Sequence, residues 1–200
     1  MLVDLTMRLG RQTPAYPGDP EVEISQVANL DSDGFLDHVI RCGTHNGTHI
    51  DAPGHMIRGG NMLGAYRPDR FVGRGRLLDL RSQRPPDVSS IEENDIVLLW
   101  TGFSEAAAAA DYYSRIPAFS TELAEQLVGR GVKLVGVDAG SVDAEPFPIH
   151  KTLLGNDVLI AENLVGLSQL VNTEFEVIAL PLNVDLDGSP ARVVARVLGR

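Results

Sequence analysis

The chain has 200 residues, of which 44% are hydrophobic, and this length suits a single domain over residues 1–200 with a sizeable core. A formal net charge of −10 argues against nucleic acid and anionic membranes as partners, and no apolar run reaches the ~18 residues of a membrane span. The one cysteine, Cys42, excludes an internal disulfide and, with a first segment unlike a signal peptide, favours a cytoplasmic location.

Two strands are predicted near the start of the chain. Residues 22–29 and 35–42 alternate between apolar and polar side chains, as half-buried strands do. The turn-forming residues 31–34 between them predict an antiparallel pair. His38 lies in the second strand, and we expect it to be an ordinary strand residue rather than part of a site.

Residues 45–55 form the most informative segment, His-Asn-Gly-Thr-His-Ile-Asp-Ala-Pro-Gly-His. It holds three of the five histidines together with one aspartate, and clustered imidazole and carboxylate groups are what a divalent metal needs. The four side chains fall on odd positions, so an extended chain would place them on one face. The segment therefore predicts a metal site built from His45, His49, Asp51 and His55.

The backbone of this segment must bend for the side chains to meet. In a straight strand His45 and His49 would lie ~13 Å apart, although two ligands of one ion each lie only ~2.1 Å from it. A helix would bring them together, but Gly47 and Pro53 argue against a helix. We therefore expect a strand that bends sharply near Gly47 and turns again at Pro53-Gly54.

Later segments alternate between strands and helices. Apolar runs predict strands at residues 75–80, 96–101, 132–137, 177–182 and 192–198. The run of alanines at residues 106–110 predicts a helix, because alanine is the best helix former. Ser120 is placed to cap another helix, which ends at Gly129 and Gly131. The buried stripe of that helix is expected to be Leu123, Leu127 and Val128. This order of elements predicts an α/β fold.

Two more candidate side chains lie in the second half of the chain. Residues 138–143 follow the carboxyl end of the strand predicted at 132–137, where α/β folds often place their sites. His150 comes shortly afterwards, and Glu162 ends a strongly apolar segment. A carboxylate in such a segment needs a partner, which is more commonly an arginine than a metal. From the residues alone, both partners of Glu162 stay open.

The segment at residues 45–55 resembles the signature of the metal-dependent cyclase family, which includes bacterial kynurenine formamidases and isatin hydrolases. The matching residues are His45-x-Gly47-Thr48-His49-x-Asp51-Ala52-Pro53-x-His55. The similarity continues in order through nearly the whole chain, at residues 14–19, 70–73, 101–103, 138–143, 150–154, 162–164, 179–182 and 187–192. The resemblance implies a layered β/β/α fold of the swivelling type, with a mixed sheet in one domain, and a homodimer.

The resemblance also implies which residues bind metal. His45, His49 and Asp51 would bind a first divalent ion. Asp51 would also bridge to a second ion in the same chain, which His150 and Glu162 would hold. Imidazole and carboxylate ligands suit zinc or manganese.

His55 is implied to be the general acid/base of a hydrolase rather than a metal ligand. Water activated by the metal would attack an amide carbonyl, and His55 would pass a proton to the departing nitrogen. The implied substrate is a small aromatic amide, first of all N-formyl-L-kynurenine. Hydrolysis of a cyclic amide or lactone stays open as an alternative, and so does a metal-stabilised binding protein without turnover.

The walls of the substrate pocket are less well defined by the sequence. Tyr16 and Phe103 are candidate aromatic walls, with packing in the core as the alternative for each. Met56 stands where many members of the family have an aromatic residue. This part of the pocket is therefore expected to differ from theirs.

Overall fold

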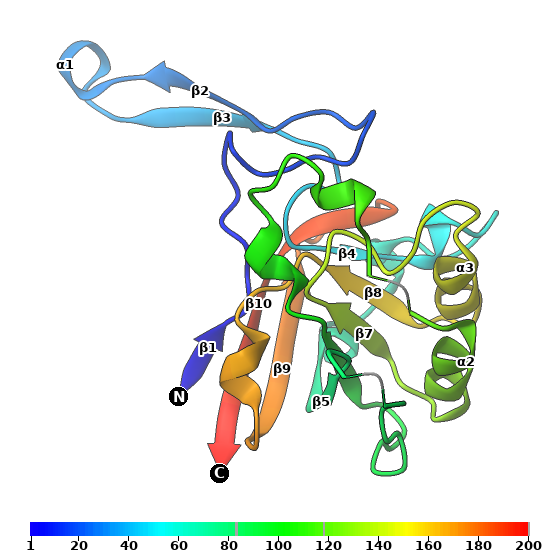
Figure 1. Ribbon diagram of the computed structural model, residues 1–200. Helices are drawn as coiled ribbons and strands as arrows, with labels where there is room; N and C mark the ends of the chain where they lie inside the picture. Colours follow the sequence, from blue (N-terminus) through cyan, green and yellow to red (C-terminus); the bar gives the residue numbers. More distant parts are fainter. Residues whose placement is uncertain (83, 118, 200) are drawn as a thin grey trace.

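An eight-stranded mixed sheet forms the body of the protein in a computed structural model that describes residues 1–82, 84–117 and 119–199 (Figure 1). In spatial order its strands are β1 (Leu2–Asp4), β10 (Gly188–Gly199), β4 (His49–Asp51), β8 (Leu159–Glu162), β7 (Leu134–Val137), β6 (Ile96–Trp100), β5 (Val72–Asp79) and β9 (Glu174–Pro181). Strands β5 to β8 are mutually parallel, and the other pairs are antiparallel. Because β9 pairs with both β5 and β10, the sheet closes on itself like a barrel.

Two apolar cores lie on the two faces of the parallel strands. On β6, Ile96 and Leu98 face the inside of the curled sheet, whereas Val97 and Leu99 face the helices. Alternate residues of a strand point to opposite faces, so a strand covered on both sides is apolar throughout. The helices α2 (Thr121–Gly129) and α3 (Pro148–Gly155) cover the outer face (Figure 1). The layers are β/β/α, which confirms the predicted α/β fold with a mixed sheet.

Most of the predicted elements are present. The predicted strands correspond to β2 (Glu23–Ala28), β3 (Asp37–Arg41), β5, β6, β7, β9 and β10. Helix α2 begins where expected, because Ser120 Oγ accepts a hydrogen bond from the backbone N–H of Leu123 at 3.1 Å. Leu123 and Leu127 are buried against the sheet, and Val128 is half-buried.

The helix predicted at residues 106–110 is wrong. The chain forms a short 3-10 helix, η4 (Phe103–Ala106), then turns, and then a second 3-10 helix, η5 (Tyr112–Ser114). Five alanines give good propensity but no apolar stripe, and a short helix without packing cannot offset the cost of its first turn. The remaining 3-10 helices are η1 (Pro53–His55), η2 (Leu63–Ala65), η3 (Pro68–Phe71) and η6 (Leu167–Leu170).

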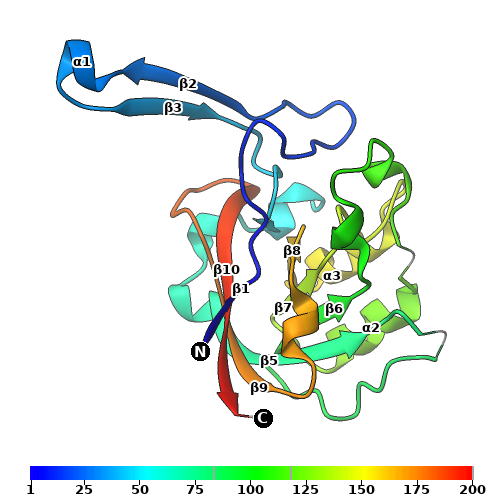
Figure 2. The same cartoon turned by 60° about the vertical axis from the view of Figure 1, so that its left-hand side comes forward.

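Strands β2 and β3 form a separate arm that projects from the body in both ribbon views (Figures 1 and 2). They pair antiparallel, as predicted, and the short helix α1 (Leu30–Asp33) joins them. Asn29 caps that helix, and Gly34 closes it with a φ of 77°, which glycine adopts without strain. His38 is an exposed strand residue of the arm, as expected.

Among the described residues, no helix is long and apolar enough to cross a membrane.

Candidate metal centre and active site

Adjacent antiparallel strands supply the first three side chains of the site. His49 and Asp51 lie on β4, and Glu162 ends β8 directly opposite His49. Residues paired across strands on one face come close together, and His49 Nε2 lies 3.6 Å from Glu162 Oε2 and 3.2 Å from Asp51 Oδ1. All three side chains are buried, and Asp51 has no exposed surface.

A bend in the backbone brings His45 to the same place. Gly47 has a φ of 63°, and this left-handed conformation reverses the chain just before β4. His45 Nδ1 consequently lies 2.7 Å from Asp51 Oδ1. The predicted bend at Gly47 and the turn at Pro53 are present, but residues 44–47 form a turn and bends rather than a strand.

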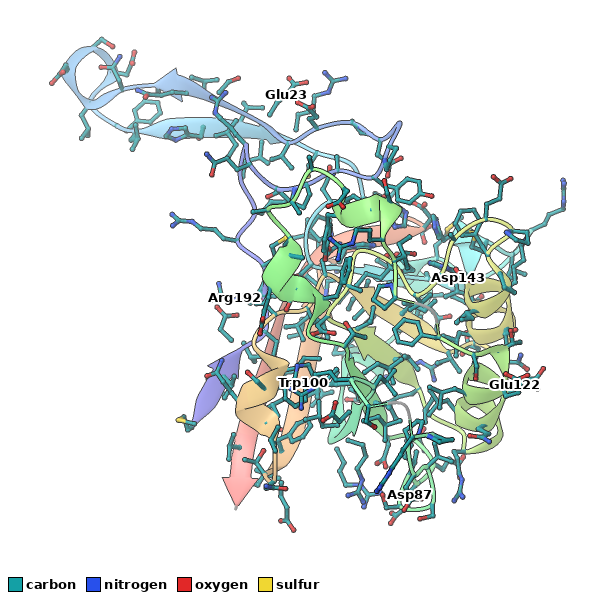
Figure 3. The ribbon with its side chains drawn as sticks, in the orientation of Figure 1. Glu23, Asp87, Trp100, Glu122, Asp143 and Arg192 are labelled. Carbon is teal, nitrogen blue, oxygen red and sulfur yellow. The ribbon has the colours of Figure 1, made fainter. Side chains whose placement is uncertain are left out.

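His150 reaches the site from helix α3 on the outer layer. Its Nε2 lies 3.3 Å from Glu162 Oε1 and 3.8 Å from Asp51 Oδ2. Asp143 fixes this position, because its Oδ2 accepts the N–H of Ile149 at 2.5 Å and its Oδ1 lies 2.6 Å from His150 Nδ1. Asp143 thus caps the first turn of α3 and also orients the imidazole. Figure 3 labels Asp143 beside α3.

Each of the three imidazoles has one nitrogen held by an outer acceptor. His45 Nε2 lies 3.0 Å from Asp187 Oδ2, and His49 Nδ1 lies 2.8 Å from the carbonyl oxygen of Gly47. Asp143 has this role for His150. A ring nitrogen that donates its proton outward leaves the opposite nitrogen to bind metal once that nitrogen has lost its own proton, and it faces Asp51 or Glu162 in every case.

The central carboxylate has an unused position. Asp51 Oδ2 is buried and has no hydrogen-bond partner among the described residues. An unpaired buried carboxylate oxygen is costly, and a cation beside it would remove that cost. Two groups of possible ligand atoms, each within 4.8 Å of one another, share Asp51. They are His45, His49 and Asp51, and Asp51, His150 and Glu162. The donor set therefore fits divalent metal.

Of the two partners considered for Glu162, arginine is not the one observed. Within the described ranges, Glu162 pairs with His49 and His150, and its Oε1 accepts the N–H of Val142 at 2.9 Å. The carboxylate therefore belongs to the histidine cluster.

The charges of the cluster set its protonation. Burial lowers the pKa of His45, but the hydrogen bond and charge of Asp51 outweigh burial and raise it to about 9. The same balance, with Asp143 and Glu162 as partners, raises the pKa of His150 to about 10. At His55 burial lowers the pKa, and the charge of Asp51 does not reverse this shift. His55 is therefore neutral at pH 7.

His55 stands beside the cluster at the wall of a cavity of about 210 Å³. Its Nδ1 lies 3.4 Å from Asp187 Oδ2, and its ring centroid lies 4.0 Å from that of His45. The cavity is lined by Tyr16, Asp19, His45, His49, Asp51, His55, Met56, Tyr113, Gly140, Ser141, Phe147, His150 and Glu162. All six predicted site residues therefore meet at one place.

The predicted aromatic walls are half right. Tyr16 lines the cavity and makes an edge-to-face contact with Tyr113, with ring centroids 5.4 Å apart. Phe103 is not among the lining residues and instead stacks on Tyr112 at 5.2 Å. Tyr113, in η5, and Phe147, just before α3, complete the aromatic wall. Neither was predicted from the sequence, because both lie in or beside short elements that depend on tertiary packing.

Comparison with known proteins places the chain in a family. Residues 3–144 match the family model described as "Putative cyclase". The kynurenine formamidase of Salinibacter ruber is 32% identical over 207 residues, covering 98% of this chain and 97% of that protein.

Two solved structures have the same fold. Isatin hydrolase A from Ralstonia solanacearum is 26% identical with a TM-score of 0.80, covering 98% of this chain and 91% of the other. Isatin hydrolase A from Labrenzia aggregata is 24% identical with a TM-score of 0.86, covering 100% and 94%. Since the family model spans well over half of the chain, the protein belongs to the cyclase family.

Proposed function

We propose that the protein is a metal-dependent hydrolase that cleaves the C–N bond of an aryl formamide, first of all N-formyl-L-kynurenine. One observation carries this proposal: buried histidines and carboxylates converge around the unpaired Asp51 Oδ2 at a small aromatic cavity beside His55. The kynurenine formamidase name of a relative at 32% identity supports the choice of substrate.

We propose zinc or manganese as the metal, with two ions per chain. His45, His49 and Asp51 would hold one ion, and Asp51, His150 and Glu162 the other. When bound, such ions polarise a carbonyl oxygen and lower the pKa of water to ~7. The absence of cysteine from this group of side chains argues against a purely structural zinc site.

His55 is the residue proposed to move the proton. Its Nδ1 faces Asp187, which leaves Nε2 as the nitrogen for proton transfer at the cavity that the ring lines. A neutral imidazole can take a proton from the attacking water and return it to the amine nitrogen as the C–N bond breaks. An aromatic amine needs less help to depart than an alkyl amine, which suits a single histidine.

The cavity favours a small substrate with one ring. At about 210 Å³ it lies below the ~300 Å³ at which pockets for drug-sized ligands begin. Tyr16, Tyr113 and Phe147 offer ring faces and edges to an aromatic substrate. A formyl group is small enough to reach the recessed carboxylates without ring strain.

A cyclic amide such as isatin is the second candidate, favoured by the fold shared with two isatin hydrolases. Met56, a flexible wall of the cavity, could admit another ring shape. The test is kcat/KM for N-formylkynurenine and for isatin with one metal-loaded preparation. A tenfold preference for isatin, equal to ~1.4 kcal/mol, would reverse the order of the two. No turnover of either would leave a binding protein.

We also propose that the protein is a homodimer built through the β2–β3 arm. An isolated two-stranded hairpin is marginally stable in water, yet this one exposes Phe35, Leu36 and Ile40 by more than half of their surface. Its tip is acidic, with Asp31, Asp33 and Asp37. A groove of about 600 Å³ at the base of the arm contains Arg8 and Arg11 beside apolar side chains. Two copies could exchange arms so that acidic tip and basic groove meet.

A further inference from the structure

One carboxylate oxygen lies between two imidazoles with different proposed tasks. Asp187 Oδ2 is 3.0 Å from His45 Nε2 and 3.4 Å from His55 Nδ1. A carboxylate oxygen has lone pairs enough to accept from both. The two rings lie at 4.0 Å with 37° between their planes, so neither can turn without affecting the other.

The backbone holds Asp187 in this position. Its carbonyl oxygen accepts the N–H of Ala52 at 2.8 Å, which ties it to the end of β4. The next residue is Gly188, where an added Cβ would lie 2.6 Å from His45 Cε1. Only glycine lets β10 approach the His45 ring this closely, and the approach sets Asp187 beside it.

The shared acceptor determines which nitrogen each ring presents. With its Nε2–H directed to Asp187, His45 turns Nδ1 toward Asp51. With its Nδ1–H directed to the same oxygen, His55 keeps Nε2 for proton transfer at the cavity that its ring lines. Outer partners of this kind fix the tautomer and orientation of a histidine.

We infer that Asp187 is a positioning residue that couples the proton-transfer group His55 to the metal-binding side chain His45. The inference rests on the proposed function. Asp187 is not among the residues that line the cavity, so it acts through the two rings and not on the substrate. Its removal loosens both rings without taking a side chain out of the cavity lining.

The first test is a double-mutant cycle at saturating zinc, with Asp187→Ala, His55→Ala and the combination of the two. We expect Asp187→Ala to lower kcat about 10–100-fold with little change in KM, since loss of an outer partner costs about that much. The double variant should be no slower than His55→Ala, because Asp187 acts through that ring. Two results would overturn the inference. One is that Asp187→Ala lowers kcat by the same factor in the His55→Ala background as in the wild type. The other is a near-normal kcat for Asp187→Ala alone.

The second test measures zinc affinity by calorimetry, which needs no substrate. Asp187→Ala should bind the His45-bound ion about 10–100-fold more weakly. The matched control is Asp185→Ala, because Asp185 is an exposed aspartate two residues away. This variant should bind zinc as tightly as the wild type does. Asp187→Asn, which keeps one acceptor oxygen, should lie between the two and covers the case in which the alanine variant misfolds. Equal affinities for Asp185→Ala and both Asp187 variants would overturn the coupling to His45. If instead the proposed function were wrong, the wild type would not hydrolyse the formamide, but Asp187→Ala would still bind zinc more weakly than the wild type.

Discussion

At the scale of single residues, the protonation of His55 governs the proposed reaction. Burial lowers its pKa from the ordinary 6.5, and the neutral form is the one that can accept a proton. Activity should therefore persist as the pH falls to 6.5 and decline only below it. The measurement is kcat against pH, with metal content followed at each point so that metal loss is not mistaken for protonation. A half-maximal point above pH 6.5 would contradict this assignment.

Replacing His55 separates proton transfer from metal binding. His55→Ala should keep its metal and lose about 10²–10⁴-fold in kcat, the usual worth of general acid/base catalysis. The competing possibility is that His55 is itself a ligand, because His45, His55 and Asp187 also lie within 4.8 Å of one another. Elemental analysis of the purified variant distinguishes the two, since a ligand's removal would lower the metal content.

Replacing Glu162, unlike replacing His55, should weaken metal binding. Glu162→Gln keeps the shape and can still accept the N–H of Val142, but it removes a charge from the cluster. Loss of an outer partner already weakens metal binding about 10–100-fold, so loss of a ligand should exceed this for the second ion. The control is Glu174→Gln, an exposed glutamate at the start of β9. Two full equivalents of metal in Glu162→Gln would show that Glu162 is not a ligand.

At the scale of elements, a carboxylate just before β6 ties that strand to β5. Asp95 is buried and bonds Arg74 at 2.7 Å and Arg76 at 3.4 Å. Burial raises the pKa of Asp95, but the Arg74 hydrogen bond and the other bonds outweigh it and lower the pKa below 3.8. A carboxyl whose pKa is lower in the folded protein than in the unfolded chain stabilises the fold at pH values above its unfolded-state pKa. This stabilisation is lost as the pH falls through the folded-state pKa.

Asp95→Asn should accordingly lower the free energy of unfolding by about 2 kcal/mol at pH 7, the worth of a hydrogen bond to a charged group. The difference from the wild type should shrink as the pH falls below 3.8. Urea unfolding at several pH values measures it. The exposed neighbour Glu93→Gln is the control and should be neutral at each pH. A difference between Asp95→Asn and wild type that does not vary with pH would contradict the ion-pair account.

The elements also show how far the sequence could lead. Strands β5, β6 and β7 could be predicted because burial on both faces requires unbroken apolar runs. Helix α3 could not, since it has eight residues and depends on Asp143 and on packing against the sheet. The helix predicted at residues 106–110 was wrong for the converse reason, because the alanine run has helix propensity but no packing partner.

The residues of the site also divide into those that could be predicted from the sequence and those that could not. The proposed metal ligands within residues 45–55 could be predicted because they are close in sequence. Asp187 was not singled out, because it lies 142 residues from His45 and only the pairing of β10 with β4 brings them together.

At the scale of the whole molecule, the proposed homodimer through the β2–β3 arm can be tested by mutation. Leu36→Asp combined with Ile40→Asp should convert a dimer to a monomer in analytical ultracentrifugation at micromolar concentration, because it places charges in an apolar interface. Leu198→Asp is the control, since Leu198 is equally exposed but lies at the C-terminal end of β10, far from the arm (Figures 1 and 2). A wild type that sediments as a monomer, or a double variant that remains a dimer, would rule out the arm as the interface.

The metal-centred hydrolysis of a formamide is tested most directly by titrating the chelated protein with zinc or manganese while N-formylkynurenine turnover is measured. The site geometry predicts no turnover without metal and a rise to a plateau at two equivalents per chain, one for each group of side chains that shares Asp51. Full turnover by the chelated protein, or none at any metal content, would contradict the account.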